Sequence, residues 1–213
     1  MAAAPEPPAA AIDPDDGGER PDERRTLWAV LLLNAAIAGG FFASGIFADS
    51  SALVANGVDN TADVAVYAIS LAALTRGDQW KARAAKASGV MLLLFAIAIP
   101  IDVGRRYIMG SEPIGATMMI ISAVAAVVNY ICLRLLQRLE KPDVNVRAAK
   151  TFSFNDFVSN GGILVAGALV LWLGSNLPDL LVGLATAGIA IKGAVEILRD
   201  AHGEEKSSNG GSI

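Results

Sequence analysis

The sequence predicts an all-α membrane protein: a bundle of six transmembrane helices with both termini in the cytoplasm. Of its 213 residues, 54% are hydrophobic and 18% are charged, and the mean hydropathy is +0.48. Soluble domains average about 25% charged residues, so this balance favours an integral membrane protein. Six apolar segments predict the helices, and the distribution of Lys and Arg predicts their orientation.

Both ends of the sequence are expected to be disordered. Residues 1–25 hold five of the nine prolines and seven acidic against three basic side chains, so they carry the whole net charge of -4. Such a composition cannot bury a core. Residues 202–213 are rich in Ser, Gly, Glu and Lys. Residues 26–201 are therefore expected to form the six-helix domain.

Charge and residue counts exclude several kinds of partner and site. Outside the acidic tail the chain has equal numbers of acidic and basic side chains, 14 of each, so it lacks a basic footprint for nucleic acid. Its single cysteine, Cys132, excludes an intramolecular disulfide, and its single histidine, His202, excludes a His-based zinc cage. No resident cofactor is indicated.

Most of the six apolar segments reach the ~20 residues that a helix needs to cross a hydrocarbon core. Residues 26–48 and 113–133 are free of charge, and Pro113 is tolerated at a helix start. Residues 87–101 are shorter and become long enough when the flanking charged residues serve as interfacial ends. The remaining segments contain acidic residues; they are 50–75, 147–173 and 177–198.

The positive-inside rule sets the orientation of the helices. With the N-terminus inside, 14 of the 17 basic side chains fall on the cytoplasmic side, in the two tails and in the connections after the second and fourth segments. Arg105 and Arg106 fall outside, and Lys192 lies within the sixth segment. Both termini are therefore predicted to be cytoplasmic. Asp102 with Arg105 and Arg106 is interpreted as an interfacial anchor.

Three carboxylates lie well inside the segments, where a charge costs at least ~2.5–3.5 kcal/mol and usually serves a function. Asp59 and Asp63 are four residues apart, which places them on one face of the second helix. Asp156 lies in the fifth helix, which runs the opposite way, so all three can converge at a similar depth. Two ionised carboxylates stay together there only if a cation lies between them; otherwise one is protonated. This pattern predicts a site that exchanges a metal cation for protons.

Further polar residues surround this trio. Asn155 and Asn160 flank Asp156 and join the predicted ligand set, although hydrogen bonding to a neighbouring helix is an equal alternative for Asn160. Lys192 and Glu196, four residues apart, are interpreted as a solvated or snorkelling pair. Glycines within the segments predict close helix packing; they are Gly39, Gly40, Gly161, Gly162, Gly183 and Gly188.

In order, spacing and topology, these motifs resemble the transmembrane domain of the cation diffusion facilitator family. The stretch ADSSALVANGVDNTAD at 48–63 is similar to that family's second helix, and TFSFNDFVSNGGIL at 151–164 to its fifth. The resemblance implies a divalent metal cation/proton antiporter that exports cations from the cytoplasm, with Asp59, Asp63 and Asp156 as ligands. The short connections and compact size favour, by analogy, a multi-pass protein of a prokaryotic inner membrane. Any homodimer is expected to form through the transmembrane helices.

The sequence departs from the family pattern in three places. Phe152 replaces the usual His or Asp one turn before the helix-five acid, so Asn155, Asn160, Ser153, a backbone carbonyl or water has to complete the ligand shell. The usual His-rich connection is reduced to residues 140–145, and the usual cytoplasmic metal-binding domain is expected to be missing. An all-oxygen ligand set suits Mn²⁺ or Fe²⁺, whereas the affinity order favours Zn²⁺ or Co²⁺, so the ion stays open.

Two other function classes stay open beside transport. A non-transporting membrane regulator or partner, derived from a transporter, fits the lost ligand and the missing domain. An intramembrane enzyme would use local signatures such as a Gly-Asp pair, and none occurs around Asp59 or Asp156. We therefore expect the protein not to be an enzyme.

Overall fold

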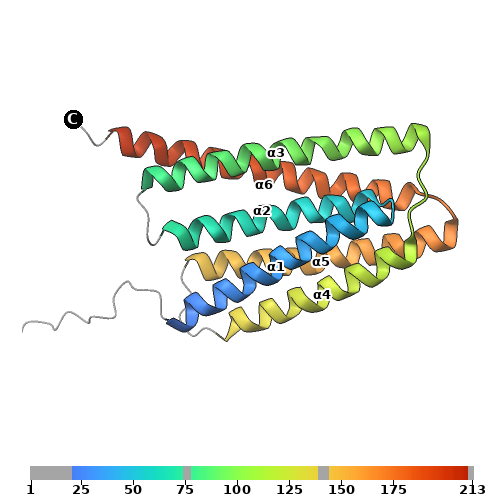
Figure 1. The fold of residues 1–213 in the computed structure, drawn as a ribbon, viewed down its shortest axis with the longest axis horizontal. Helices are drawn as coiled ribbons and strands as arrows, with labels where there is room; N and C mark the ends of the chain where they lie inside the picture. The colour runs from blue at the N-terminus through green and yellow to red at the C-terminus, as the bar shows by residue number, and fades with distance from the viewer. Residues whose placement is uncertain (1–20, 74–77, 139–143, 211–213) are drawn as a thin grey trace, which may run out of the picture.

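A computed structural model describes residues 21–73, 78–138 and 144–210. The helices are α1 (Pro21–Phe47), α2 (Ser51–Ala73), α3 (Asp78–Met109), α4 (Gly115–Gln137), α5 (Val144–Leu173) and α6 (Leu177–Gly210). Within these described ranges the chain contains no strand, which confirms the predicted all-α fold with six helices. Consecutive helices run antiparallel along one axis, so the start of α1 and the end of α6 lie at the same end of the bundle (Figure 1). We call this end the terminal end and the other the opposite end.

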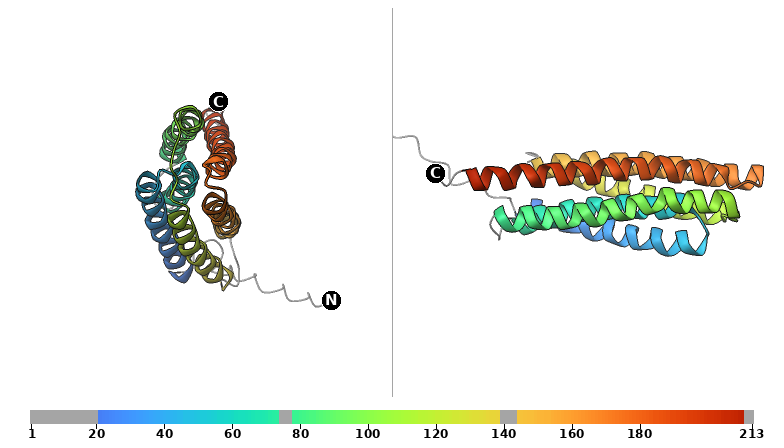
Figure 2. Two further views of the ribbon diagram at one scale, coloured as in Figure 1. Left: turned by 90° about the vertical axis from the view of Figure 1, so that its right-hand side faces the viewer. Right: turned by 90° about the horizontal axis from the view of Figure 1, so that it is seen from above.

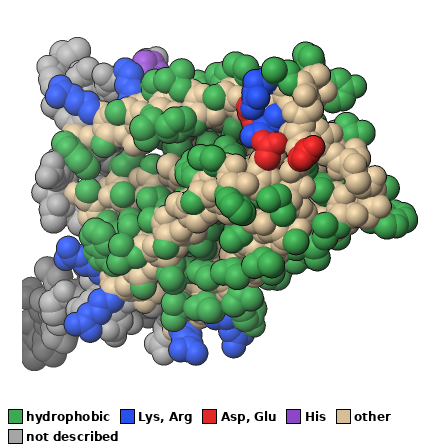
Figure 3. Space-filling view, turned by 45° about the vertical axis from the view of Figure 1, so that its right-hand side comes forward, with side chains coloured by type: hydrophobic (Ala, Val, Ile, Leu, Met, Phe, Trp, Pro, Cys, Tyr) green, Lys and Arg blue, Asp and Glu red, His purple; other side chains and the backbone are tan. Residues whose placement is uncertain are grey.

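The outer surface of the bundle is suited to lipid. Five of the described helices, all except α2, are long and apolar enough to cross a membrane. Large apolar side chains point outward, such as Leu32 (62% exposed), Ile101 (69%) and Trp172 (80%). Hydrophobic side chains spread over the face drawn in Figure 3, while Lys and Arg gather mainly near the terminal end. Soluble proteins rarely expose apolar patches of this extent, so the chain is an integral membrane protein.

Helix α2 is the one described helix that is not apolar enough to cross a membrane by itself, and other helices surround it. It lies in the middle of the bundle, where it packs closely against α1, α3 and α6 and touches α5 over a shorter stretch (Figure 2). Leu53, Asn56 and Asn60 on α2 are completely buried. Because α2 faces other helices rather than lipid, it can carry polar residues and still complete the six-helix bundle.

Several helices extend beyond the apolar segments that predict them. α1 begins at Pro21, α3 begins at Asp78 and α6 continues to Gly210, whereas the apolar segments begin at residues 26 and 87 and end at residue 198. Apolar patterning marks only the part of a helix that meets lipid or core, so it does not show how far polar residues continue the helix. The 34 residues of α6 span about 51 Å, against ~30 Å for a hydrocarbon core. Disorder is expected for residues 1–25 and 202–213, but residues 21–25 belong to α1 and residues 202–210 to α6. Residues 1–20 and 211–213 fall outside the described residues.

Close helix crossings occur at glycines, but mostly not at the expected ones. A Cβ added to Gly115 would lie 2.5 Å from the carbonyl oxygen of Gly167, so α4 and α5 cross here backbone to backbone. Gly183 is also tight, since its Cβ would lie 2.9 Å from the carbonyl carbon of Ser51. The prediction was wrong for five glycines whose Cβ would meet nothing within 4 Å, because sequence spacing does not tell which face of a membrane helix meets protein. These are Gly39, Gly40, Gly161, Gly162 and Gly188.

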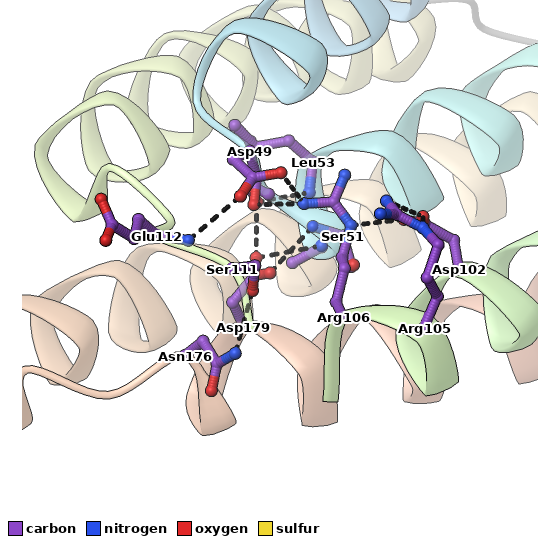
Figure 4. A network of polar contacts seen from close by, with 12 residues as sticks. Asp49, Ser51, Leu53, Asp102, Arg105, Arg106, Ser111, Glu112, Asn176 and Asp179 are labelled. Atoms are coloured by element: carbon purple, nitrogen blue, oxygen red, sulfur yellow. Dashed lines mark hydrogen bonds and ion pairs between the residues drawn. The ribbon is translucent and has the colours of Figure 1, made fainter. Parts of the chain in front are cut away.

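At the opposite end, Asp179 of α6 holds the first turn of α2 (Figure 4). The Asp179 side chain is completely buried and accepts hydrogen bonds from the Ser50 hydroxyl (2.5 Å) and from the backbone N–H groups of Ser51 (2.8 Å) and Ala52 (3.1 Å). The first N–H groups of a helix have no partner within it, and a carboxylate there also interacts favourably with the helix dipole. Asp179 therefore caps α2 from another helix.

Arg106 extends this opposite-end network to the neighbouring connections. It donates to the Asp102 carboxylate (2.5 Å), and to both the carbonyl (2.7 Å) and the carboxylate of Asp49 in the turn between α1 and α2. The Asp49 carboxylate also accepts from the backbone N–H of Glu112 (3.0 Å). Asp102 also pairs with Arg105 at 2.7 Å, as the anchor interpretation expects. The network thus holds α2, α3, α6 and their connections together.

Candidate cation site between α2, α5 and α6

A cavity of about 310 Å³ lies between α2, α5 and α6, where α2 and α5 touch only over a short stretch. Its lining from α2 is spaced by three and four residues, as one face of a helix requires. The same spacing holds along α6. The α2 residues are Asp59, Ala62, Asp63 and Val66, those from α5 are Asn155 and Asp156, and those from α6 are Ile189, Lys192, Gly193, Glu196 and Ile197.

The cavity brings together all three carboxylates that the sequence singles out. Asp59 and Asp63 are half-buried in its wall, and Asp156 is only 2% exposed. One oxygen of Asp156, Oδ2, is buried and has no hydrogen-bond partner among the described residues. A buried carboxylate oxygen is costly when nothing compensates it. This oxygen is therefore available to a cation, a proton or an ordered water.

The carboxylates do not form a closed ligand set. Within the described part of the chain, no three Asp, Glu, His or Cys side chains lie close enough to hold one metal ion together. The assignment of Asp59, Asp63 and Asp156 as joint ligands stays a prediction. Phe152 belongs to α5, but its side chain lies outside those described, so its relation to Asp156 also stays a prediction.

The two asparagines of the predicted set occupy different places. Asn155 lines the cavity with an exposed side chain. Asn160 is absent from the cavity lining; its Oδ1 accepts a hydrogen bond from Asn56 of α2 at 3.0 Å. The Ser159 hydroxyl donates to the Asn56 Oδ1 at 2.9 Å. These bonds join α5 to α2 one turn beyond the acids. Asn160 thus bonds to a neighbouring helix, which is the alternative to its role as a ligand.

Several polar side chains of α2, α4 and α5 are buried inside the bundle. Asp156 and Asn160 lie four residues apart on one buried face of α5. The Asn160 Nδ2, the Asn60 Oδ1 and both side-chain polar atoms of Asn129 are buried without a hydrogen-bond partner among the described residues. Buried polar atoms are normally satisfied by protein groups or ordered water. This interior can therefore accommodate water or an ion.

Helix α6 adds two charges that sequence reasoning did not place at this site. Lys192 and Glu196 both line the cavity, and their Nζ and Oε1 atoms are 3.8 Å apart. Both side chains are largely exposed, at 78% and 60%. The sequence showed the i,i+4 pair but not the rotation of α6, and that rotation decides whether the pair faces the cavity or points away from it.

Comparison with known proteins agrees with this architecture. Residues 27–203 match the family model described as the cation efflux transmembrane domain. Over 122 residues, the chain is 25% identical to the zinc transporter ZitB of Yersinia pseudotuberculosis serotype I (strain IP32953) and 24% identical to the zinc transporter ZitB of Escherichia coli (strain K12). Each alignment covers 57% of this chain and 39% of the relative. The chain thus spans about two fifths of the length of these curated relatives.

Proposed function

We propose, because this chain belongs to the cation efflux family, that it exports a divalent metal cation from the cytoplasm across the membrane in which it is embedded. The observation that carries this proposal is the cavity that Asp59, Asp63 and Asp156 line together inside the bundle. Ionised carboxylates at membrane depth are costly unless a positive charge compensates them. A divalent cation supplies that charge and is also the chemical class that three carboxylates attract.

The position of the cavity favours loading from the cytoplasm. It includes residues 189–197 of α6, in the half of the apolar span Leu177–Arg199 that is nearer the terminal end, whereas Asp179 and Arg106 tie the opposite end together. The positive-inside rule assigns the terminal end to the cytoplasm. A second arrangement that opens the opposite end would complete alternating access.

Proton exchange accounts for the release of the cation. Carboxylates have to lose protons to bind a metal, and they can regain them when the metal leaves. A pH difference across the membrane would then drive efflux as metal/proton antiport. Asp156 is the most deeply buried of the three acids and has an oxygen without a hydrogen-bond partner in the described structure, so we assign it the central place in this exchange.

The cargo is a divalent first-row cation, and Zn²⁺ is the first to test because the curated relatives are named zinc transporters. Mn²⁺, Fe²⁺ and Co²⁺ are the other candidates. The acids and amides of the predicted site offer oxygen ligands, which Mn²⁺ accepts well, while the affinity order favours Zn²⁺ and Co²⁺ over Mn²⁺. Metal competition on the purified protein decides among them.

A non-transporting regulator is the second candidate function. It is favoured by the open arrangement of the three acids, which do not form a set able to hold one metal ion within the described structure. The enzyme alternative is set aside, because the chain belongs to a family of transporters rather than of enzymes.

Transport by reconstituted vesicles tests the proposal. The purified protein is placed in liposomes that contain a Zn²⁺-sensitive and a pH-sensitive dye, and a pH difference is imposed. We expect Zn²⁺ movement coupled to opposite proton movement, and the loss of both in Asp59→Ala, Asp63→Ala and Asp156→Ala. Removing a buried carboxylate eases membrane insertion, so these variants should reach the membrane normally.

Glu112→Gln is the matched control, because Glu112 is exposed at the opposite end and lies outside the cavity lining. It should transport like the wild type. Wild-type flux in any one aspartate variant would remove that residue from the site. Zn²⁺ binding without flux in the wild type would favour the regulator.

A further inference from the structure

Among the described residues that line the cavity, Lys192 is the one with a basic side chain. It stands on the α6 wall, facing a space that the acids Asp59, Asp63, Asp156 and Glu196 also line. With these groups ionised the lining carries four negative charges and one positive charge. A buried or membrane-depth carboxylate needs a compensating charge, and Lys192 offers one that belongs to the protein itself.

The contact between Lys192 and Glu196 is too loose to fix the ammonium in place. The two charged atoms are 3.8 Å apart, and both side chains are largely exposed. Exposed ion pairs of this kind restrain their side chains weakly. The Lys ammonium is a compact charge on a flexible four-carbon stem, so it can reach different acceptors along one wall of the cavity.

We propose that Lys192 is a tethered counter-cation of the transport site, which compensates the aspartates while the metal is absent and withdraws to Glu196 when a divalent cation enters. This inference rests on the proposed function. The ammonium and the metal exclude each other from the aspartates because like charges repel strongly where water is scarce. Glu196, one helical turn further towards the terminal end, then holds the displaced ammonium.

This arrangement discriminates between monovalent and divalent cations. A monovalent cation that replaces the ammonium leaves the charge beside the aspartates unchanged, so it gains little. A divalent cation adds one positive charge to the same place and gains the difference. Displacing the Lys192 ammonium costs the same for every cation, so monovalent cations, which bind the aspartates weakly, are kept out while a divalent cation still binds.

Calorimetric titration of the purified protein with Zn²⁺, in detergent and at several K⁺ concentrations, tests the inference. Lys192→Gln should bind Zn²⁺ about tenfold more tightly, the change that corresponds to about 1.4 kcal/mol, and should lose more of this binding as K⁺ rises. Lys192→Arg keeps the charge and should stay close to the wild type. Glu196→Gln should weaken Zn²⁺ binding, because the displaced ammonium has lost its acceptor.

The double variant separates this role from a simple charge effect. If Glu196 acts through Lys192, Glu196→Gln should have no effect in the Lys192→Gln background. Weakening of the same size in both backgrounds would overturn the proposal. Arg199→Gln removes an exposed charge from α6 outside the cavity lining, and equal tightening in this control would also overturn it.

The outcomes for the two proposals are distinct. Zn²⁺ binding by the wild type with no tightening in Lys192→Gln would refute the role of Lys192 and leave the transport proposal standing. Failure of the wild type to bind Zn²⁺, Mn²⁺ or Co²⁺ would refute the proposed function and this inference with it.

Discussion

Replacement of Asp179 by Asn should destabilise the bundle at its opposite end. The Asp179 carboxylate is completely buried and accepts three hydrogen bonds from Ser50, Ser51 and Ala52 at the start of α2. Asn keeps one acceptor oxygen and presents an NH₂ group in place of the other. At least one donor of the α2 terminus then faces another donor, and the remaining bonds lose their charge.

The expected loss follows from these contacts. A hydrogen bond to a charged group contributes about 1.5–3 kcal/mol, a neutral one about 0.5–1.5 kcal/mol, and a buried donor left unpaired costs about 1–3 kcal/mol. Together they predict a loss of about 3 kcal/mol for Asp179→Asn. Removing an ordinary helix cap costs about 1 kcal/mol. For a chain of this size, 3 kcal/mol lowers the Tm by about 6–12 °C.

Thermal unfolding in a mild detergent, followed by tryptophan fluorescence, measures this loss. Glu112→Gln is the control, because only the backbone N–H of this residue contacts Asp49 in the opposite-end network and its side chain is exposed. Its Tm should match that of the wild type. An Asp179→Asn protein that unfolds at the wild-type temperature, or a control that falls as far, would refute the assignment of Asp179 as a buried cap of α2.

Two further predictions concern the metal preference and the assembly. Phe152→His should tighten Zn²⁺ binding relative to Mn²⁺, because a histidine one turn before Asp156 adds a nitrogen ligand that Zn²⁺ accepts more readily. Competition between the two metals measures this change. An unchanged preference would place Phe152 outside the ligand shell. We expect any homodimer to be held by transmembrane faces rich in small residues, so it should dissociate in harsh detergent and weaken in Gly162→Leu, whose position is open within the protomer. A dimer that survives harsh detergent but dissociates when residues 202–213 are trimmed would contradict this.

The helices could be predicted from the sequence because lipid imposes a strong constraint on composition. Segments free of charge, such as residues 26–48 and 113–133, match α1 and α4 to within a few residues at the lipid-facing part. Helix ends were less predictable. The polar start of α3 at Asp78 and the polar end of α6 at Gly210 carry no apolar periodicity, so nothing in their patterning distinguishes a helix from a tail.

The acids of the candidate site could be found in the sequence because charge is rare at membrane depth. Asp59, Asp63 and Asp156 stand out for that reason, and all three line one cavity. The parts played by Lys192 and Asp179 depend on which face of α6 meets α2, and a single sequence does not contain that rotation. Asp179 did leave a local signal, as an acid in the first turn of an apolar helix, but its partners belong to α2.

The contacts around α2 differ in strength. They indicate which contacts would break if the cavity opened towards the opposite end. Asp179 binds the start of α2 to α6, and α4 and α5 cross backbone to backbone at Gly115 and Gly167. Between α2 and α5 the packing is sparse, and Asn56 with Asn160 supplies a bond of 3.0 Å just beyond the acids. Separating α5 from α2 at this level would break neutral hydrogen bonds, among them those that Asn56 makes with Asn160 and with Ser159. Separating α2 from α6 instead breaks the charged cap. The first movement leaves the charged cap intact and parts a sparsely packed boundary, so we expect the bundle to open between α2 and α5.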